Sequence, residues 1–236
     1  MIRALIVDDE MHARQELQVL LQQLGGVEIL ASCANAVDAL RQINALRPQA
    51  LFLDIQMPMI DGFQLLSMID PERMPHVVFV TAYDEYALKA FEEKTLDYLL
   101  KPVDKERLTR AVQKLRAVLE SGQIPRYALP VLHQIPCLRG QRIKLVPVDA
   151  IESVRSGLTG VHVGTVEGEF FTEMTLKTLE DQTPLLRCHK QTLINPQHID
   201  EIQVHDNGTA EITARSGRQF GVSRRYLRQL RQALQL

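Results

Sequence analysis

The 236-residue sequence has few cysteines and no long apolar run, and both features narrow its class. The three cysteines, Cys33, Cys137 and Cys188, lie far apart and form no Cys-x-x-Cys pair. This argues against a disulfide framework or a zinc site and fits a reducing cytoplasm. No apolar run approaches the roughly 20 residues that span a bilayer, so we expect no membrane segment. The chain enters a predicted strand almost directly after Met1, and we therefore expect no signal peptide.

Acidic residues are absent from the last part of the chain, although the formal net charge of the whole is only −2. Residues 1–120 contain 13 Lys and Arg against 18 Asp and Glu, a net charge of −5. Residues 137–236 contain 13 against 11, a net charge of +2, and no acid follows Glu211. The length fits two domains, and this basic end favours a polyanionic partner for the second. Its basic residues are Arg215, Arg218, Arg224, Arg225, Arg228 and Arg231.

Residues 1–120 alternate short, continuously apolar runs with helical patterns. Such runs are typical of strands buried on both faces, as in a parallel sheet covered by helices. Five strands, each followed by a helix, predict a doubly wound α/β domain with a five-stranded parallel sheet. We expect strands at about 5–7, 28–33, 51–53, 77–80 and 98–100, and helices at about 17–24, 36–46, from 62, 84–92 and 105–120.

Four of these strands end at residues with a chemical function. Asp8 and Asp9 follow the first strand, Asp54 follows the third, Thr81 ends the fourth and Lys101 follows the fifth. Because a ligand site in such a sheet lies just beyond the carboxyl ends of the strands, we expect these side chains to converge. A single Asp after a strand is more typical of a helix cap or a turn, so the interpretation rests on the whole ordered set.

The converging groups predict a phosphorylation site built around a divalent metal. Adjacent carboxylates repel each other unless a cation lies between them, and Mg²⁺ commonly bridges carboxylates to a phosphate. Asp54 is the candidate nucleophile, because an aspartate can attack phosphorus and form an acyl phosphate. Lys101 supplies a positive charge for the phosphoryl oxygens, and Thr81 a small hydrogen-bond donor. Tyr98, near the start of the fifth strand, is placed to turn inward when Thr81 moves.

These motifs together resemble the receiver domain of bacterial two-component response regulators, which has a flavodoxin-like fold. The resemblance covers residues 1–120. It rests on Leu5-Ile6-Val7-Asp8-Asp9-Glu10, Asp54-Ile55-Gln56-Met57-Pro58 with Asp61-Gly62, Thr81-Ala82, and Lys101-Pro102.

The resemblance implies that a partner sensor histidine kinase phosphorylates Asp54. It also implies that the phosphorylated chain forms a homodimer through about residues 84–120. By the same resemblance the Mg²⁺ ligands are Asp8, Asp9, Asp54 and the backbone carbonyl of Gln56, the phosphoryl contacts are Thr81 and Lys101, and the aromatic switch is Tyr98.

An enzyme of the aspartyl-phosphate hydrolase type is the first alternative, because it also uses strand-end Asp and Lys residues with Mg²⁺. Such enzymes need a general acid two residues after the nucleophile. Here that position is Gln56, an amide that cannot transfer the proton. The phosphotransfer and autodephosphorylation of a receiver act on the chain itself, so we do not class the chain as an enzyme.

The pattern changes after residue 120. Residues 121–136 contain Ser121-Gly122 and three prolines that interrupt any long helix, which predicts a linker. Beyond it, period-two alternation separated by glycine-containing turn signals predicts a mostly antiparallel β domain over residues 137–236. We expect strands at about 142–146, 160–163, 201–204 and 209–213, and helices at about 175–181 and 223–236.

Two motifs of this second half resemble the LytTR DNA-binding domain: Leu185-Leu186-Arg187-Cys188-His189-Lys190-Gln191-Thr192-Leu193-Ile194-Asn195 and Val222-Ser223-Arg224-Arg225-Tyr226-Leu227. The resemblance covers about residues 137–236 and implies that loops of a β fold enter successive major grooves of double-stranded DNA. Gln191 and Thr192 depart from the family's usual small polar and aromatic residues, which leaves the base preference open. The candidate DNA contacts are His189, Lys190, Gln191, Arg224, Arg225, Arg228, and Arg155, Ser156 and Thr159 of the loop at 155–159.

The last predicted helix supports a nucleic-acid partner. Leucines follow one of its faces and arginines the opposite face, an arrangement that suits packing on one side and phosphate contacts on the other. A β domain that binds protein or RNA is the second alternative, because an arginine-rich tail allows either. The leucines are Leu227, Leu230 and Leu234, and the arginines are Arg224, Arg228 and Arg231.

Overall fold

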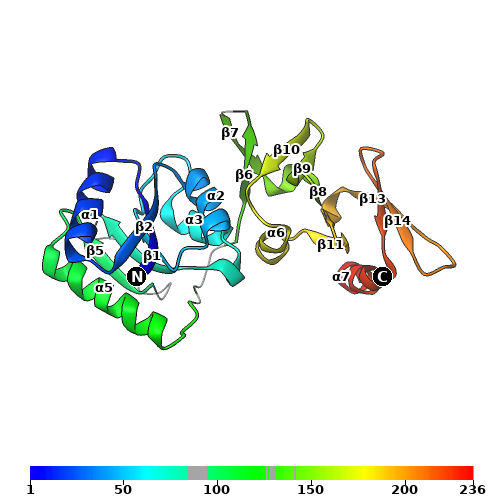
Figure 1. Ribbon diagram of the computed structural model, residues 1–236. Helices are drawn as coiled ribbons and strands as arrows, with labels where there is room; N and C mark the ends of the chain where they lie inside the picture. Colours follow the sequence, from blue (N-terminus) through cyan, green and yellow to red (C-terminus); the bar gives the residue numbers. More distant parts are fainter. Residues whose placement is uncertain (84–94, 126, 128–130, 141, 236) are drawn as a thin grey trace. The chain divides into compact units, whose positions relative to one another are not determined.

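The structure, a computed structural model, describes residues 1–83, 95–125, 127, 131–140 and 142–235 (Figure 1). The chain divides into two compact units, Met1–Pro130 and Val131–Leu236. Among the described residues, no helix is long and apolar enough to span a membrane.

A five-stranded sheet forms the centre of the first unit, in the order β2-β1-β3-β4-β5. All neighbouring strands run parallel, which confirms the predicted doubly wound α/β fold. From β1 the chain continues to β2 on one side of the sheet, and from β3 it continues to β4 and β5 on the other side. The topological switch point therefore lies between β1 and β3, at their carboxyl ends. The strands are β1 (Ile2–Val7), β2 (Val27–Cys33), β3 (Ala50–Leu53), β4 (His76–Thr81) and β5 (Asp97–Leu100).

Helices cover both faces of this sheet (Figure 1). Helix α1 contacts α5, and α2 contacts α3. Strands β3 and β4 are buried along their whole length, as their continuous apolar sequences predict. The helix predicted at 84–92 lies outside the described residues. The helices are α1 (Met11–Leu24), α2 (Ala36–Leu46), α3 (Gly62–Met68) and α5 (Lys105–Glu120), with a 3₁₀ turn at Pro71–Arg73.

Polar side chains begin three of these helices. Asn35, Asp61 and Asp104 each accept a hydrogen bond from a backbone N–H of the following first turn. At Asp61 the side chain of Gln64 bonds back to the backbone N–H of Asp61, which completes a capping box. Gly25 ends α1 at a φ of 74°, a conformation that favours glycine.

The second unit is built mainly from antiparallel β structure, as predicted. Its larger sheet has seven strands in the order β11-β12-β8-β9-β10-β6-β7, and its smaller sheet has the order β13-β14-β15. The strands are β6 (Gln134–Arg139), β7 (Arg142–Pro147), β8 (Ile151–Gly157), β9 (Gly160–Thr165), β10 (Gly168–Thr172), β11 (Leu186–His189), β12 (Thr192–Ile194), β13 (Ile199–Val204), β14 (Ala210–Ala214) and β15 (Gln219–Val222). Strand β6 therefore begins inside the segment 121–136 that the sequence indicates as a linker.

Two helices and two 3₁₀ turns complete the second unit. Helix α6 spans Leu176–Gln182 and α7 spans Arg224–Leu234, close to their predicted ranges. The 3₁₀ turns are Val148–Ala150 and Pro196–His198. Helix α7 packs on β11 and on the smaller sheet, and its buried residues Leu227 and Leu230 join a core that contains Ile212 and Phe220.

Candidate functional site

Three carboxylates meet at the carboxyl ends of β1 and β3. Because these strands are adjacent and parallel, Asp8 and Asp9 after β1 lie beside Asp54 after β3, and the Asp54 backbone N–H donates to the carbonyl of Val7 at 2.8 Å. One ligand oxygen from each carboxylate lies within 4.8 Å of the others. Asp8 and Asp54 are only 4% and 5% exposed, whereas Asp9 is exposed. The convergence predicted for the ends of the first and third strands is therefore observed.

Lys101, directly after β5, joins the two buried carboxylates. Its Nζ lies 2.7 Å from Asp8 Oδ2 and 2.7 Å from Asp54 Oδ2. The Lys101 backbone N–H donates to the carbonyl of Thr81 at 2.9 Å, which fixes the end of β5 beside that of β4. The Lys101–Pro102 peptide bond is cis.

The pKa values of this cluster reflect a competition between burial and pairing. Burial alone lowers the pKa of Lys101, but the hydrogen bonds and charges of Asp54 and Asp8 raise it above the ordinary value for lysine. Burial raises the pKa of Asp8, although the bond to Lys101 opposes this. Lys101 contacts both carboxylates directly, and these ion pairs outweigh the effect of its burial. The lysine is therefore charged at neutral pH.

The donor set suits Mg²⁺. Three carboxylates offer hard oxygen ligands, and Lys101 neutralises only part of their charge. Backbone N–H groups hold two of the carboxylates from outside: Glu10 donates to Asp8 Oδ1 at 2.9 Å and Gln56 to Asp54 Oδ1 at 3.3 Å. These two aspartates are therefore held in their loops through Oδ1, while the Oδ2 atom of each contacts Lys101 inside the cluster.

Thr81 ends β4 next to this cluster. Its side chain is fully buried, and its Oγ1 has no hydrogen-bond partner among the residues that the structure describes. A buried hydroxyl that is left unpaired costs about 1–3 kcal/mol, so this group would gain from a new polar neighbour. Tyr98 is half-buried, with its ring edge-on to Phe79 at a centroid distance of 6.4 Å, and its hydroxyl donates to the backbone carbonyl of Tyr83.

Two further residues support the cluster, and the sequence carried no clear signal for the first. Arg14 of α1 donates from Nη1 to the carbonyls of Asp8 and Asp9, at 2.6 and 3.0 Å, and thereby holds the turn after β1. Gly62 begins α3 against the Asp54 loop. A Cβ atom at Gly62 would lie 2.5 Å from the carbonyl oxygen of Asp54, so only glycine fits there without a shift of the loop.

Two loops that were predicted to contact DNA are neighbours in the second unit. Lys190 and Gln191 form the exposed turn between β11 and β12, and His189 before them is half-buried. The Gln191 carbonyl accepts a 2.9 Å bond from the backbone N–H of Ser156, near the end of β8. Because β8 pairs with both β12 and β9, the turns at 190–191 and 158–159 lie at the same end of the larger sheet.

The start of α7 joins these two loops. The Ser223 backbone N–H donates to the carbonyl of Cys188 in β11 at 3.2 Å. Arg224 and Arg225 follow it and are exposed, and Arg228 is exposed one turn later, opposite the buried leucines. Backbone hydrogen bonds therefore join the end of β8 to the turn at 190–191, and the residue before α7 to β11, the strand that leads into this turn.

Several arginines of the second unit are already paired. Arg155, a candidate contact, forms an exposed ion pair with Glu169. Arg187 donates to Glu180 and, at 3.0 Å, to the Lys190 carbonyl, so it positions the turn at 190–191. Arg218 forms an ion pair with the buried Glu152, and is not as available to a polyanion as the sequence suggests. The sequence does not reveal these partners, because they come from other elements of the fold: Glu169 from β10, Glu180 from α6 and Glu152 from β8.

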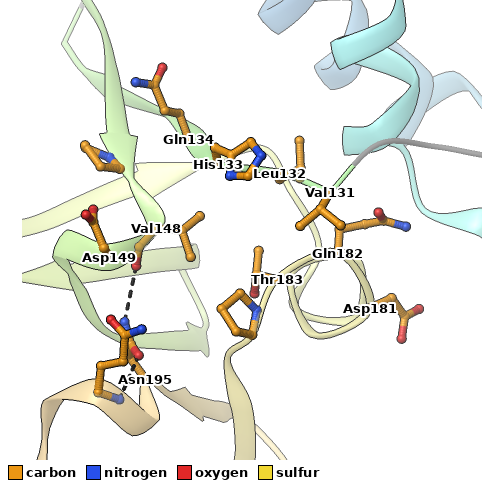
Figure 2. Close-up of a pocket in the computed structure, with 13 residues that line it drawn as sticks. Val131, Leu132, His133, Gln134, Val148, Asp149, Asp181, Gln182, Thr183 and Asn195 are labelled. Atoms are coloured by element: carbon orange, nitrogen blue, oxygen red, sulfur yellow. Dashed lines mark hydrogen bonds between the residues drawn. The ribbon is translucent and has the colours of Figure 1, made fainter.

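A groove of about 670 Å³ lies elsewhere in the second unit (Figure 2). Its buried amide, Asn195, donates to the carbonyls of Val148 and Ile151 and accepts from Gln197 N–H, so this side chain is fully used within the fold. Among the residues that the structure describes, no lysine or arginine lines the groove, so this lining gives no support for a phosphate-binding surface. The lining residues are Val131, Leu132, His133, Gln134, Pro147, Val148, Asp149, Asp181, Gln182, Thr183, Pro184, Asn195 and Gln197.

Comparison with known proteins gives matches to both units. Residues 4–113 match the family described as response regulator receiver domain, and residues 141–235 match the LytTr DNA-binding domain. The chain is 49% identical over 241 residues to the transcriptional regulatory protein BtsR of Salmonella typhi, with 100% of both chains covered. It is 48% identical over 241 residues to BtsR of Escherichia coli K12, again with 100% of both covered. It is 48% identical over 236 residues to an uncharacterized response regulatory protein of Yersinia pestis, with 99% of each covered.

Proposed function

Because the chain belongs to the response regulators that join a receiver domain to a LytTR DNA-binding domain, we propose that a partner histidine kinase phosphorylates it on Asp54. The phosphorylated chain then dimerises and binds promoter DNA in the cytoplasm. The observation that carries this proposal is the contact of one lysine, Lys101, with both buried carboxylates at 2.7 Å. It supports the proposal because the side chains proposed as nucleophile, phosphoryl-binding cation and metal ligands belong to one cluster.

The chemistry proposed for this cluster is a transfer of a phosphoryl group to Asp54. An Asp54 carboxylate oxygen attacks the phosphorus of a phosphohistidine, the new O–P bond forms, and the P–N bond to the imidazole breaks. Lys101 then exchanges its contact with Asp54 for one with a phosphoryl oxygen. Mg²⁺, when held by the three carboxylates and the Gln56 carbonyl, supplies positive charge for the phosphoryl oxygens. No catalytic turnover of a foreign substrate is proposed, because the amide of Gln56 cannot serve as a general acid.

The buried hydroxyl of Thr81 is the proposed sensor of the phosphoryl group on Asp54. It has no hydrogen-bond partner among the described residues, so a phosphoryl oxygen on Asp54 would give it one. A shift of Thr81 favours the inward position of Tyr98, which means a shift between two existing conformations. The proposed dimer surface is about residues 84–120. Its described part contains β5 and α5, and residues 84–94 lie outside the described residues.

Asp54→Asn tests the input. Acetyl phosphate or beryllofluoride with Mg²⁺ should increase the dimer fraction in analytical ultracentrifugation and tighten DNA binding, because dimerisation links two DNA-binding units. Asp54→Asn should abolish both responses. Glu16→Gln, which removes an exposed carboxylate from α1, is the matched control and should respond normally. An unchanged response of Asp54→Asn would refute phosphorylation at this residue.

Lys190→Ala and Arg228→Ala test the proposed DNA binding of the second unit. Lys190 lies in the turn predicted to read bases, so its loss should flatten the preference for a cognate over a scrambled duplex. Arg228 lies on the exposed face of α7 and is expected to contact phosphate. Its loss should weaken binding to both duplexes equally and reduce the salt slope by about one. If Lys190→Ala keeps full discrimination, the base-reading role of this turn is wrong. A stronger affinity for RNA than for duplex DNA would favour the alternative output.

A further inference from the structure

Leu158 is the most exposed large hydrophobic side chain among the described residues, with a relative exposure of 109%. It lies with Thr159 at the tip of the β8–β9 hairpin, where the last strand pair is Gly157 with Gly160. Neither glycine has a side chain that could shield it. The leucine therefore projects alone into solvent from a short turn.

The surroundings of Leu158 are polar and belong to the proposed DNA surface. The hairpin is joined to the turn of Lys190 and Gln191 through the 2.9 Å bond from Ser156 N–H to the Gln191 carbonyl. Two-residue hairpin loops favour Asn, Asp and Gly, so the turn itself gives no reason for a leucine at its tip. An apolar side chain at this place gains only if a partner covers it.

We propose that Leu158 contacts the 5-methyl group of a thymine in the major groove and so sets the base preference at one position of each half-site. This inference rests on the proposed function, because it assumes that the hairpin enters DNA. Thymine is the one base whose major-groove edge carries a methyl group, and apolar side chains recognise it by contact. A charged phosphate, in contrast, forms no favourable contact with the apolar side chain of leucine.

A second copy of the chain is a less suitable partner for this residue. A stable protein interface buries about 800 Å² on each partner, whereas a hairpin tip of two residues offers a small area. The exposed residues Lys190 and Gln191 are also the groups that would have to be desolvated against a protein, whereas Arg155 is already paired with Glu169. Against DNA the same groups find base edges and phosphates, so the charges favour DNA as the occupant.

Thymine-to-deoxyuridine replacement tests the contact directly. A duplex bound specifically by the full chain is first selected from a random pool, and each thymine in turn is replaced by deoxyuridine, which lacks the methyl group. At one position per half-site, the replacement should weaken wild-type binding about fourfold, the value for burying one methyl-sized group. Leu158→Ala should bind the original duplex more weakly by a similar factor and should not distinguish thymine from deoxyuridine at that position.

Val166→Ala is the matched control. Val166 is 76% exposed and lies in the β9–β10 turn, at the opposite end of β9 from Leu158. This variant should keep both the affinity and the methyl preference of the wild type.

If the wild type binds the selected duplex but shows no methyl preference at any position, the inference about Leu158 is wrong while the proposed function stands. Equal weakening of Leu158→Ala on all duplexes, with the methyl preference kept, also overturns it. If no duplex is bound specifically, the proposed function itself fails, and the inference with it.

Discussion

Arg218→Ala should destabilise the second unit much more than the removal of a neighbouring arginine. Glu152 is 1% exposed, its Oε2 lies 3.3 Å from Arg218 Nη1, and neither carboxylate oxygen has a hydrogen-bond partner among the described residues. The arginine is thus the partner that compensates a buried charge. Removing one partner of a buried pair costs about 3–5 kcal/mol. The Arg218 side chain is 40% exposed, so water screens part of the interaction, and we expect about 2–3 kcal/mol.

Calorimetry of the full chain can measure this loss. For a unit of this size, 1 kcal/mol lowers the unfolding temperature by about 4–8 °C, so Arg218→Ala should lower it by roughly 10–20 °C. The proposed Mg²⁺ site lies in the first unit, so Mg²⁺ is expected to raise the unfolding temperature of that unit alone. The transition that does not move with Mg²⁺ is then assigned to the second unit. Arg215→Ala removes an exposed arginine from the same hairpin and should change stability by about 0.5 kcal/mol or less.

The double variant decides whether the buried charge is the cause. Glu152→Gln removes the charge and keeps the shape of the side chain. If the uncompensated carboxylate is what destabilises Arg218→Ala, the addition of Glu152→Gln should restore part of the lost stability. The reasoning is refuted if the double variant is less stable than Arg218→Ala alone. It is also refuted if the unfolding temperatures of Arg218→Ala and Arg215→Ala differ by less than roughly 2 °C, which is the shift expected for a surface substitution.

Three further predictions concern the first unit. Tyr127→Phe removes the hydroxyl that accepts a 2.9 Å hydrogen bond from the Val77 backbone N–H. In urea unfolding, this variant should lower the free energy of unfolding of the first unit by about 1–3 kcal/mol. A change below about 0.5 kcal/mol, the level of surface substitutions, would contradict this prediction. Burial lowers the pKa of His76, so the folded state prefers the neutral ring. The contribution of His76 to stability should be complete above the unfolded pKa of about 6.5 and should fall as the pH drops below it. Unfolding curves of His76→Gln at several pH values should show no such decrease in stability. Gly62→Ala should displace the Asp54 loop and slow phosphorylation by acetyl phosphate, because its Cβ would lie 2.5 Å from the Asp54 carbonyl; an unchanged rate would show that the loop adapts.

The receiver half could be predicted from the sequence because its signals are local. Parallel strands buried on both faces are continuous apolar runs, and β3 and β4 are buried at every position, as expected from such runs. Once each strand is found, its carboxyl end follows, and the rule that these ends share one edge places Asp54 beside Lys101. This convergence could be predicted from the sequence, whereas the strand order and the contacts of Lys101 with both Asp8 and Asp54 come from the structure.

The second half could be predicted only in outline. Alternation identified β7 and β9, but β8 carries Glu152 and Ser153 at buried positions, which breaks the expected pattern of a half-buried strand. The order β11-β12-β8-β9-β10-β6-β7 depends on pairings between distant segments that no local motif records. For the same reason Arg218 was predicted as part of a polyanion-binding stretch, whereas the structure pairs it with Glu152.

The two candidate sites differ in how much they tolerate change. In the receiver site the side chains of the cluster hold one another, since Lys101 contacts both Asp8 and Asp54. We therefore expect a substitution of any one of them to alter the positions of the other two. The proposed DNA surface is instead held by backbone hydrogen bonds, from Ser156 to Gln191 and from Ser223 to Cys188, while the contacting side chains project outward. If the two proposed functions are correct, base preference should be able to change by substitution at exposed tips without loss of the loop geometry, whereas phosphorylation should require the whole cluster to be kept.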